Sequence, residues 1–163
     1  MKYFLLFSIS FSISFSQEFS YETFNANSLY KEGLNFYKQK DYKKAIEKLE
    51  ICQNVNSCSS LLAQIYQENT EFRNLEKSIY FYKVSIKLGN NKLLHNLGNF
   101  YFRNRDFNNA KKIYKKSIKA NNYESLFNLG KLYELESNLT KALSCYKKAS
   151  KYNISEADYT LGV

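Results

Sequence analysis

Residues Leu94 to Lys119 have the sequence LHNLGNFYFRNRDFNNAKKIYKKSIK, which indicates the fold of the whole chain. It contains two segments of helical length, in which apolar residues recur at spacings of three and four, joined at Arg105-Asp106. The same pattern recurs before and after this stretch in a chain of 163 residues. We therefore expect an all-α protein made of successive helical hairpins.

A very small residue recurs in the first helix of each unit. Gly33, Gly98, Gly130 and Gly162 occupy this position, and Ala63 takes it in the second unit. Glycine inside a helix costs about 1 kcal/mol relative to alanine. Its recurrence predicts that a bulky side chain of the partner helix comes close at each of these points.

The second helix of each unit carries a small, a large and a small residue at i, i+4 and i+7, which lie on one face of a helix. These positions are Ala45, Leu49 and Cys52; Ser78, Tyr82 and Ser85; Ala110, Tyr114 and Ser117; and Ala142, Tyr146 and Ala149. We expect the large side chain to fill the groove between helices and the small ones to let the next helix approach.

Capping residues place the helix ends. Strong N-cap residues precede the second helices, and residues that tolerate the left-handed conformation follow them. The N-caps are Asp41, Asn74, Asp106 and Asn138, and the stops are Gly89-Asn90, Asn121-Asn122 and Asn153. Helices are predicted at about 27–39, 42–54, 57–68, 75–88, 92–104, 107–120, 123–136 and 139–152, with a ninth from Ser155. The second unit has three extra residues in its turn, Glu68 to Asn74, which we expect to be mobile.

This pattern of small, large and capping residues resembles the tetratricopeptide repeat, a helical hairpin of about 34 residues. The resemblance lies in two sets of residues, Leu97-Gly98, Tyr101, Ala110, Tyr114 and Ser117, and Leu129-Gly130, Tyr133, Ala142, Tyr146 and Ala149. Lys77-Ser78 and Ile86 to Gly89 are similar to the Sel1-like relatives. The departures are a spacing of 32 residues in the later units and the absence of proline.

The resemblance implies a right-handed α-α superhelical solenoid over residues 26–163. Its units would be 26–55, 56–90, 91–122 and 123–154, with a partial fifth, 155–163. In such arrays the first helices line a concave groove for extended peptides or partner helices, and no enzyme activity or cofactor is implied.

The residues expected to line this groove combine amides, cations and aromatic rings, which suit a peptide backbone and an acidic group. They are Tyr30, Tyr37, Lys38, Gln64, Gln67, Lys92, Asn96, Asn99, Phe102, Arg103, Phe127, Asn128, Lys131 and Glu134. Some family members capture a C-terminal carboxylate with Lys and Asn at comparable places, but Leu34 and Gln64 break that pattern here.

Lysines concentrate on the second helices and contribute to a formal net charge of +9. They include Lys43, Lys44 and Lys48; Lys111, Lys112, Lys115, Lys116 and Lys119; and Lys147, Lys148 and Lys151. A basic convex face of this kind favours either simple solubility or contact with an anionic envelope polymer or lipid surface. An envelope- or polysaccharide-associated structural protein is thus the alternative to a peptide-binding scaffold. Nucleic acid is not an expected partner of an exported protein.

Residues 1–16 do not fit the repeat. One lysine precedes an apolar run, and Ser14-Phe15-Ser16 places small residues where a signal peptidase reads. We interpret 1–16 as a secretory signal peptide and 17–25 as a linker, which predicts an exported protein. The alternative is an amphipathic strand, since serines alternate with the apolar residues. No stretch reaches the 18 apolar residues of a membrane span.

Cys52 and Cys58 lie six residues apart across a predicted turn. In an oxidising compartment they would form a disulfide, and otherwise they would be two partly buried thiols. Cys145 is expected to face outward. His95 is the only histidine, which excludes most metal sites and acid–base pairs, and we expect it to be a hydrogen-bonded helix residue.

The segment Asp158 to Val163 repeats the beginning of a first helix and then stops. It would be the start of a further unit in a longer chain, a lid, or an open end that pairs with another copy.

Overall fold

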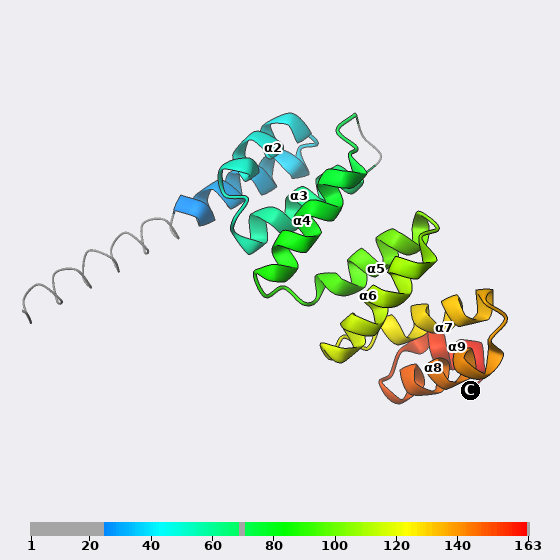
Figure 1. Cartoon of the computed structure of the whole chain (residues 1–163). Coiled ribbons are helices and arrows are strands. Elements are labelled where there is room, and N and C mark those ends of the chain that lie inside the picture. The colour runs from blue at the N-terminus through cyan, green and yellow to red at the C-terminus, as the bar shows by residue number, and fades with distance from the viewer. Residues whose placement is uncertain (1–24, 69–70, 163) are drawn as a thin grey trace, which may run out of the picture. The chain divides into compact units, whose positions relative to one another are not determined.

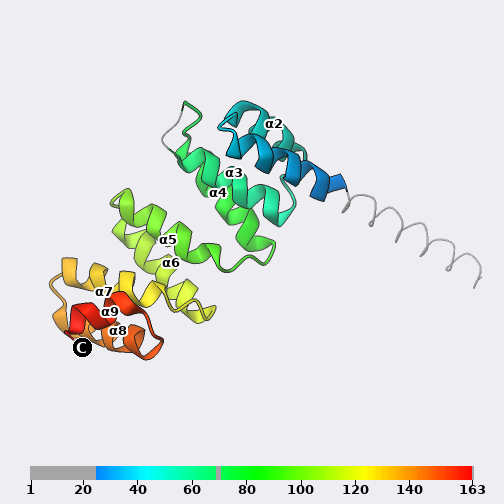
Figure 2. The same ribbon diagram turned by 180° about the vertical axis from the view of Figure 1, so that it is seen from behind.

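The computed structural model describes residues 25–68 and 71–162, which form nine helices and no strand (Figures 1 and 2). The predicted signal peptide, the linker up to residue 24, and Asn69 and Thr70 of the predicted mobile loop lie outside the described residues. The helices are α1 (25–38), α2 (Tyr42–Ile51), α3 (Asn56–Gln67), α4 (Leu75–Lys87), α5 (Leu93–Arg103), α6 (Phe107–Lys119), α7 (Ser125–Leu135), α8 (Leu139–Lys151) and α9 (Ser155–Leu161).

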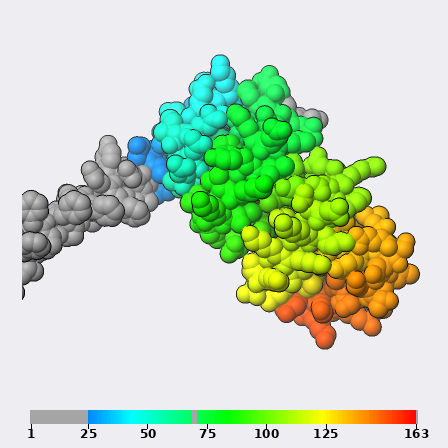
Figure 3. Space-filling view, viewed as in Figure 1, coloured from blue at the N-terminus to red at the C-terminus, as the bar shows by residue number. Residues whose placement is uncertain are grey.

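The chain divides into two compact units, one ending at Phe81 and one beginning at Tyr82. In the first unit, α2 packs against α3, and Ser78 on α4 donates a hydrogen bond of 2.8 Å to the Ala63 carbonyl on α3. In the second unit each helix from α5 to α9 packs against the next. Figure 3 shows the side chains of each unit packed around its own helices.

The predicted close approach at the glycines is confirmed in three hairpins. A Cβ atom built on Gly98 would lie 2.5 Å from two carbons of the Tyr114 ring, and one on Gly130 would lie equally close to Tyr146. At Gly33 the nearest atom is the Leu49 Cγ, at 2.6 Å. These glycines let the two helices of a hairpin press against each other.

The prediction for Gly162 was wrong. This residue ends α9 in the left-handed conformation, with φ of +71°, and no atom lies within 4 Å of its virtual Cβ. A glycine at this position is explained by backbone conformation, because no atom of the described residues comes close to it.

The small, large and small positions of the second helices are buried as predicted. On α8 the buried face is Ala142, Cys145, Tyr146 and Ala149. The expectation that Cys145 faces outward was wrong, because a residue three positions after Ala142 shares the same helical face. Its side chain packs with Ala110, Tyr114, Leu129 and Leu132 in one core cluster of the second unit.

In three of the turns between a first and a second helix, the same residue closes the end of the first helix and caps the start of the second. In the turn between α1 and α2, the Lys40 N–H donates to the Tyr37 carbonyl and the Asp41 N–H donates to the Phe36 carbonyl, which is a Schellman motif. Asp41 then accepts from the Lys44 N–H as the N-cap of α2. One residue therefore ends one helix and begins the next.

The same turn recurs between α5 and α6, where Asp106 is the N-cap, and between α7 and α8, where Asn138 is the N-cap. The residues before these N-caps, Lys40, Arg105 and Ser137, have φ near +60°. Asn74 also caps its helix as predicted, with a bond of 3.0 Å from the Lys77 N–H. The predicted left-handed stops are present at Gly89, Asn121 and Asn153.

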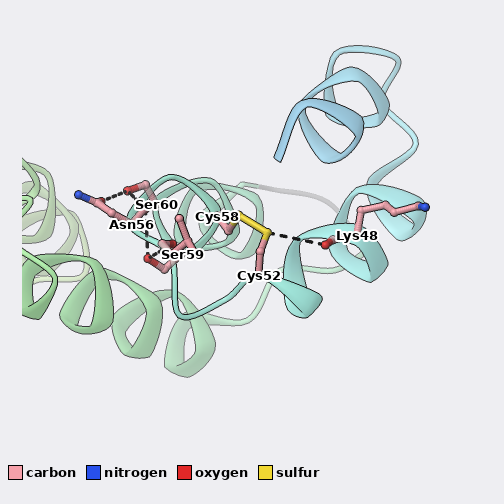
Figure 4. The surroundings of a disulfide bond; sticks show 7 residues. Lys48, Cys52, Asn56, Cys58, Ser59 and Ser60 are labelled. Carbon is pink, nitrogen blue, oxygen red and sulfur yellow. Dashed lines mark hydrogen bonds between the residues drawn. A yellow bond between two sulfur atoms is a disulfide. The ribbon is translucent and has the colours of Figure 1, made fainter. Parts of the chain in front are cut away.

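A disulfide closes the short connection between α2 and α3 (Figure 4). The Cα atoms of Cys52 and Cys58 lie 5.8 Å apart, and both side chains are buried. The N-cap of α3 is Val55, which offers no capping side chain, so the disulfide fixes a helix start that lacks such a cap. Inside the first turn, Ser59 donates to the carbonyls of Val55 and Asn56.

Candidate peptide-binding surface

The residues predicted to bind a peptide fall into two groups, one in each unit. Tyr30, Tyr37, Lys38, Gln64 and Gln67 belong to the first unit. The other nine, from Lys92 to Glu134, belong to the second.

In the first unit, Tyr37 connects two neighbouring first helices. Its hydroxyl donates to a carboxylate oxygen of Glu68 at 2.5 Å and accepts from the Gln64 side-chain amide at 2.7 Å. Burial and the bond to Glu68 raise the pKa of Tyr37 to about 12. Lys38 and Gln64 are exposed, whereas Tyr30 and Gln67 are half-buried.

In the second unit, the side-chain amide of Asn99 connects α5, α6 and α7. Its Oδ1 accepts from the Tyr114 hydroxyl on α6 at 2.7 Å and from the Asn128 amide on α7 at 2.8 Å. Its Nδ2 lies 2.9 Å from Nε2 of His95, one helical turn earlier on α5. Since Oδ1 must accept both bonds, Nδ2 is the donor toward His95.

His95 completes this network in its neutral form. Because Nε2 accepts from Asn99, the ring proton lies on Nδ1, which is 3.1 Å from the Ser125 hydroxyl on α7. Burial lowers the pKa of His95, and the nearby Glu124 carboxylate, 3.9 Å away, opposes this shift. His95 is therefore a hydrogen-bonded helix residue, as expected.

Around this network the predicted residues Lys92, Asn96 and Lys131 are exposed to solvent. The Lys131 ammonium lies 5.4 Å from the centre of the Phe127 ring, close enough for a cation–π contact. Amides that can pair with main-chain groups thus lie close to cations on α5 and α7.

The remaining predicted residues do not join the Asn99 network. The Phe102 ring packs 5.7 Å from that of Phe107, and Arg103 is exposed at the end of α5. Glu134 accepts a 2.7 Å hydrogen bond from the Tyr146 hydroxyl, which ties it to its own hairpin.

Four participants were not predicted as site residues: Glu68, His95, Tyr114 and Ser125. One clue was available for Tyr114. Tyr114 occupies the repeat position that Leu49 occupies in the first hairpin. Unlike leucine, a buried tyrosine carries a hydroxyl that needs a hydrogen-bond partner. Glu68, His95 and Ser125 had no comparable clue, because the bonds from Tyr37 to Glu68 and between His95 and Ser125 join residues 31 and 30 positions apart on different helices.

Within residues 25–68 and 71–162, no three His, Cys, Asp or Glu side chains come together in a way that would hold a metal ion. No helix in the same part of the chain is long and apolar enough to cross a membrane. Side-chain amides and two exposed lysines lie on or next to α5 and α7. The successive helical hairpins define a helical-repeat protein.

Family models identify the repeat. The tetratricopeptide repeat models match residues 92–122 and 123–153 and residues 27–55, together more than half of the chain. The chain belongs to the tetratricopeptide repeat family, whose members generally mediate protein–protein interaction. No curated protein matches it.

Solved structures support the same fold. A protective antigen of uropathogenic Escherichia coli that displays an SLR fold is 24% identical, with a TM-score of 0.66 over 88% of this chain and 34% of that one. A Sel1 repeat protein from Oxalobacter formigenes is 20% identical, with a TM-score of 0.67 over 86% of this chain and 64% of that one. MamA is 20% identical, with a TM-score of 0.66 over 88% and 87% of the two chains. The chain therefore spans less than two thirds of the first two proteins. Their SLR and Sel1 repeat folds agree with the expected Sel1-like character of the fold.

Proposed function

We propose that the protein is an exported, non-enzymatic scaffold that binds an extended peptide or a partner helix against the first helices of its repeats. The observation that carries this proposal is the Asn99 network, which holds Asn128 of α7 beside α5 at 2.8 Å. Side chains fixed in advance lose little conformational freedom on binding.

The second unit supplies the groups that a peptide backbone needs. The bond to Asn99 uses one N–H of Asn128, so its Oδ1 remains to accept from a main-chain N–H and its second N–H to donate. Asn96 is exposed one turn before Phe100 and offers another amide. We therefore expect a segment bound in extended form, with its main chain paired to these side chains.

Charge favours an acidic segment. Lys92 and Lys131 are exposed, and neither ammonium group forms an ion pair with a described residue. Carboxylates of a partner, or the carboxylate at its C-terminus, would complement them. Their exposure means that they would contribute mainly to association rate and specificity.

Charge-reversal variants test this surface. We would select acidic peptides that bind the mature protein from a displayed random library and compare K92E/K131E with K112E/K147E. Both variants change the net charge equally, and Lys112 and Lys147 are exposed on second helices. Loss of binding in K92E/K131E with retention in K112E/K147E supports the proposal. Equal binding by both variants and the wild type contradicts it.

Two observations support export. The first is the apolar segment within residues 1–16, and the second is the Cys52–Cys58 disulfide, a bond that persists in oxidising compartments. N-terminal sequencing of the protein secreted by its own cells tests the expected cleavage after Ser16. A cellular protein that retains Met1 and three free thiols contradicts export.

A second candidate function rests on the lysines of the second helices. Lys112, Lys115, Lys116 and Lys119 are all exposed on α6. They would hold an anionic envelope polymer or lipid surface in a structural role. Cosedimentation with such a polymer that disappears in high salt, together with failure to recover any protein partner by crosslinking, would favour this function over the first.

Self-association through α9 is a further expectation of the proposed scaffold. Tyr159 on this helix is 90% exposed, so its ring is accessible to another copy of the chain. We expect Tyr159→Ser to lower the mass measured by sedimentation if α9 pairs with another copy. A wild-type protein that stays monomeric at high concentration rules this contact out.

A further inference from the structure

An open groove runs between the second helices α6 and α8, on a surface that the Asn99 network does not use. One hollow in it has a volume of about 430 Å³, within the range of sites that hold a side chain or small ligand. Its floor is apolar, formed by Ile118 of α6 and by Leu126, Leu129 and Tyr133 of α7.

The groove continues toward the end of α8. A second hollow of about 540 Å³ shares Ile118, Leu126 and Lys148 with the first. It ends at the stacked rings of Tyr123 and Tyr152, whose centres lie 3.7 Å apart. The two hollows therefore form one elongated apolar groove, which we call the α6–α8 groove.

Lysines line both edges of the α6–α8 groove. Lys115 and Lys119 stand on the α6 edge, and Lys141, Lys148 and Lys151 stand on the α8 edge. None of the five forms an ion pair with a described residue. No acidic side chain lines either hollow.

We propose that the α6–α8 groove is a docking site for an acidic amphipathic helix of a partner protein. The apolar floor would receive side chains at i, i+3 or i+4 and i+7 of that helix, and the lysines would meet acidic residues on both sides of this ridge. The positive charge along both edges, together with the apolar floor, favours a helix over the other possible occupants. A single-chain lipid acid presents charge at one end only, and an anionic polymer has no apolar ridge for the floor.

Cys145 provides a reporter inside the groove. It lines the first hollow and is the only cysteine outside the disulfide, so a thiol reagent modifies one site. Burial raises the pKa of the Cys145 thiol, and the positive charges of Lys148 and Lys115 oppose this rise. Both lysines line the same hollow as Cys145.

The experiment uses a synthetic amphipathic helix with leucines on one face and glutamates beside them, labelled for fluorescence anisotropy. The binding protein is the mature chain with its disulfide intact. K115E/K148E changes the groove edges, and K112E/K147E is the matched control with the same change in net charge. Ser144→Phe adds a ring at an exposed position that lines the groove, so it blocks the floor without altering charge or the core.

We expect the peptide to bind and to slow alkylation of Cys145. Affinity should fall about tenfold or more in K115E/K148E and in Ser144→Phe, and remain within about twofold in K112E/K147E. K92E/K131E should also retain binding, which separates this site from the surface on the first helices.

Several results would overturn the proposal. One is equal binding of polyglutamate or of a scrambled peptide of the same composition, which would indicate charge alone. Another is protection of Cys145 by dodecanoate without binding of the peptide, which would identify a lipid acid as the occupant. A third is an equal loss of affinity in K115E/K148E and in its control K112E/K147E. Concentration-dependent dimerisation that excludes the peptide would instead identify a second copy of the chain.

Discussion

Gly98→Ala adds a single methyl group at the tightest contact of the α5–α6 hairpin. The new Cβ would lie 2.5 Å from Cδ1 and Cε1 of Tyr114, whereas ordinary contact begins at 3.4 Å. The ring or the helix must therefore move by about 1 Å. The ring has no free space, because Tyr114 is 0% exposed and its hydroxyl is tied to Asn99.

The magnitude follows from two opposing effects. Overpacking a filled core costs about 1–3 kcal/mol. Replacing glycine by alanine in the middle of a helix returns about 1 kcal/mol. Because the buried ring cannot move aside, the overpacking cost should lie in the upper part of that range, at about 2–3 kcal/mol. We therefore expect Gly98→Ala to lower the free energy of unfolding by about 1–2 kcal/mol, despite the better helix propensity of alanine.

A double-mutant cycle with Tyr114→Ala isolates the contact. Without the ring nothing opposes the methyl group, so Gly98→Ala should stabilise the Tyr114→Ala protein by up to about 1 kcal/mol. The assay is urea unfolding followed by helical circular dichroism, for the wild type, both single variants and the double variant. The close packing of α5 on α6 would be refuted by a Gly98→Ala protein that is as stable as the wild type.

Three other changes test separate features. Reduction of the Cys52–Cys58 disulfide should lower the free energy of unfolding by about 2 kcal/mol, because its closed loop is short, and an unchanged urea midpoint after reduction would contradict this. Arg105→Gly should raise stability by about 0.5–1 kcal/mol by relieving a left-handed residue at φ of 60°, and a lower melting temperature would argue against that conformation. The pKa of His95 is lowered in the folded protein, so its contribution is full above the unfolded value of about 6.5 and is lost as the pH falls below it. His95→Gln should reduce the loss of stability that is measured as the pH falls from 7 to 5. A wild-type protein that becomes more stable as the pH falls from 7 to 5 would contradict this prediction.

Much of the fold could be predicted from the sequence because each hairpin repeats the same local rules. The spacing of Ala110, Tyr114 and Ser117 predicts a buried face, and Asp106 predicts the start of α6. The helix ends were predicted less accurately. Helix α2 was expected to end near residue 54 but ends at Ile51, because the turn closed by the disulfide begins at Cys52. The role of Gly162 could not be predicted, because a glycine that permits close packing and one that ends a helix look alike in a sequence.

The candidate site was harder to predict because its contacts cross between repeats. Asn99 and Asn128 were both expected on one face, but the bond between them depends on how α5 packs on α7. His95 was expected to be hydrogen-bonded, whereas its partner Ser125 comes 30 residues later. The α6–α8 groove was not foreseen, because the sequence shows its lysines but not the apolar floor between them.

The shared residue of the three tight turns has a consequence for how this protein can vary. Asp41, Asp106 and Asn138 each finish one helix through a backbone bond and start the next through a side-chain cap, so each corner uses one residue for both tasks. The residues just before them are a lysine, an arginine and a serine, all exposed. These corners can therefore change their surface chemistry from repeat to repeat while the scaffold beneath them keeps its shape.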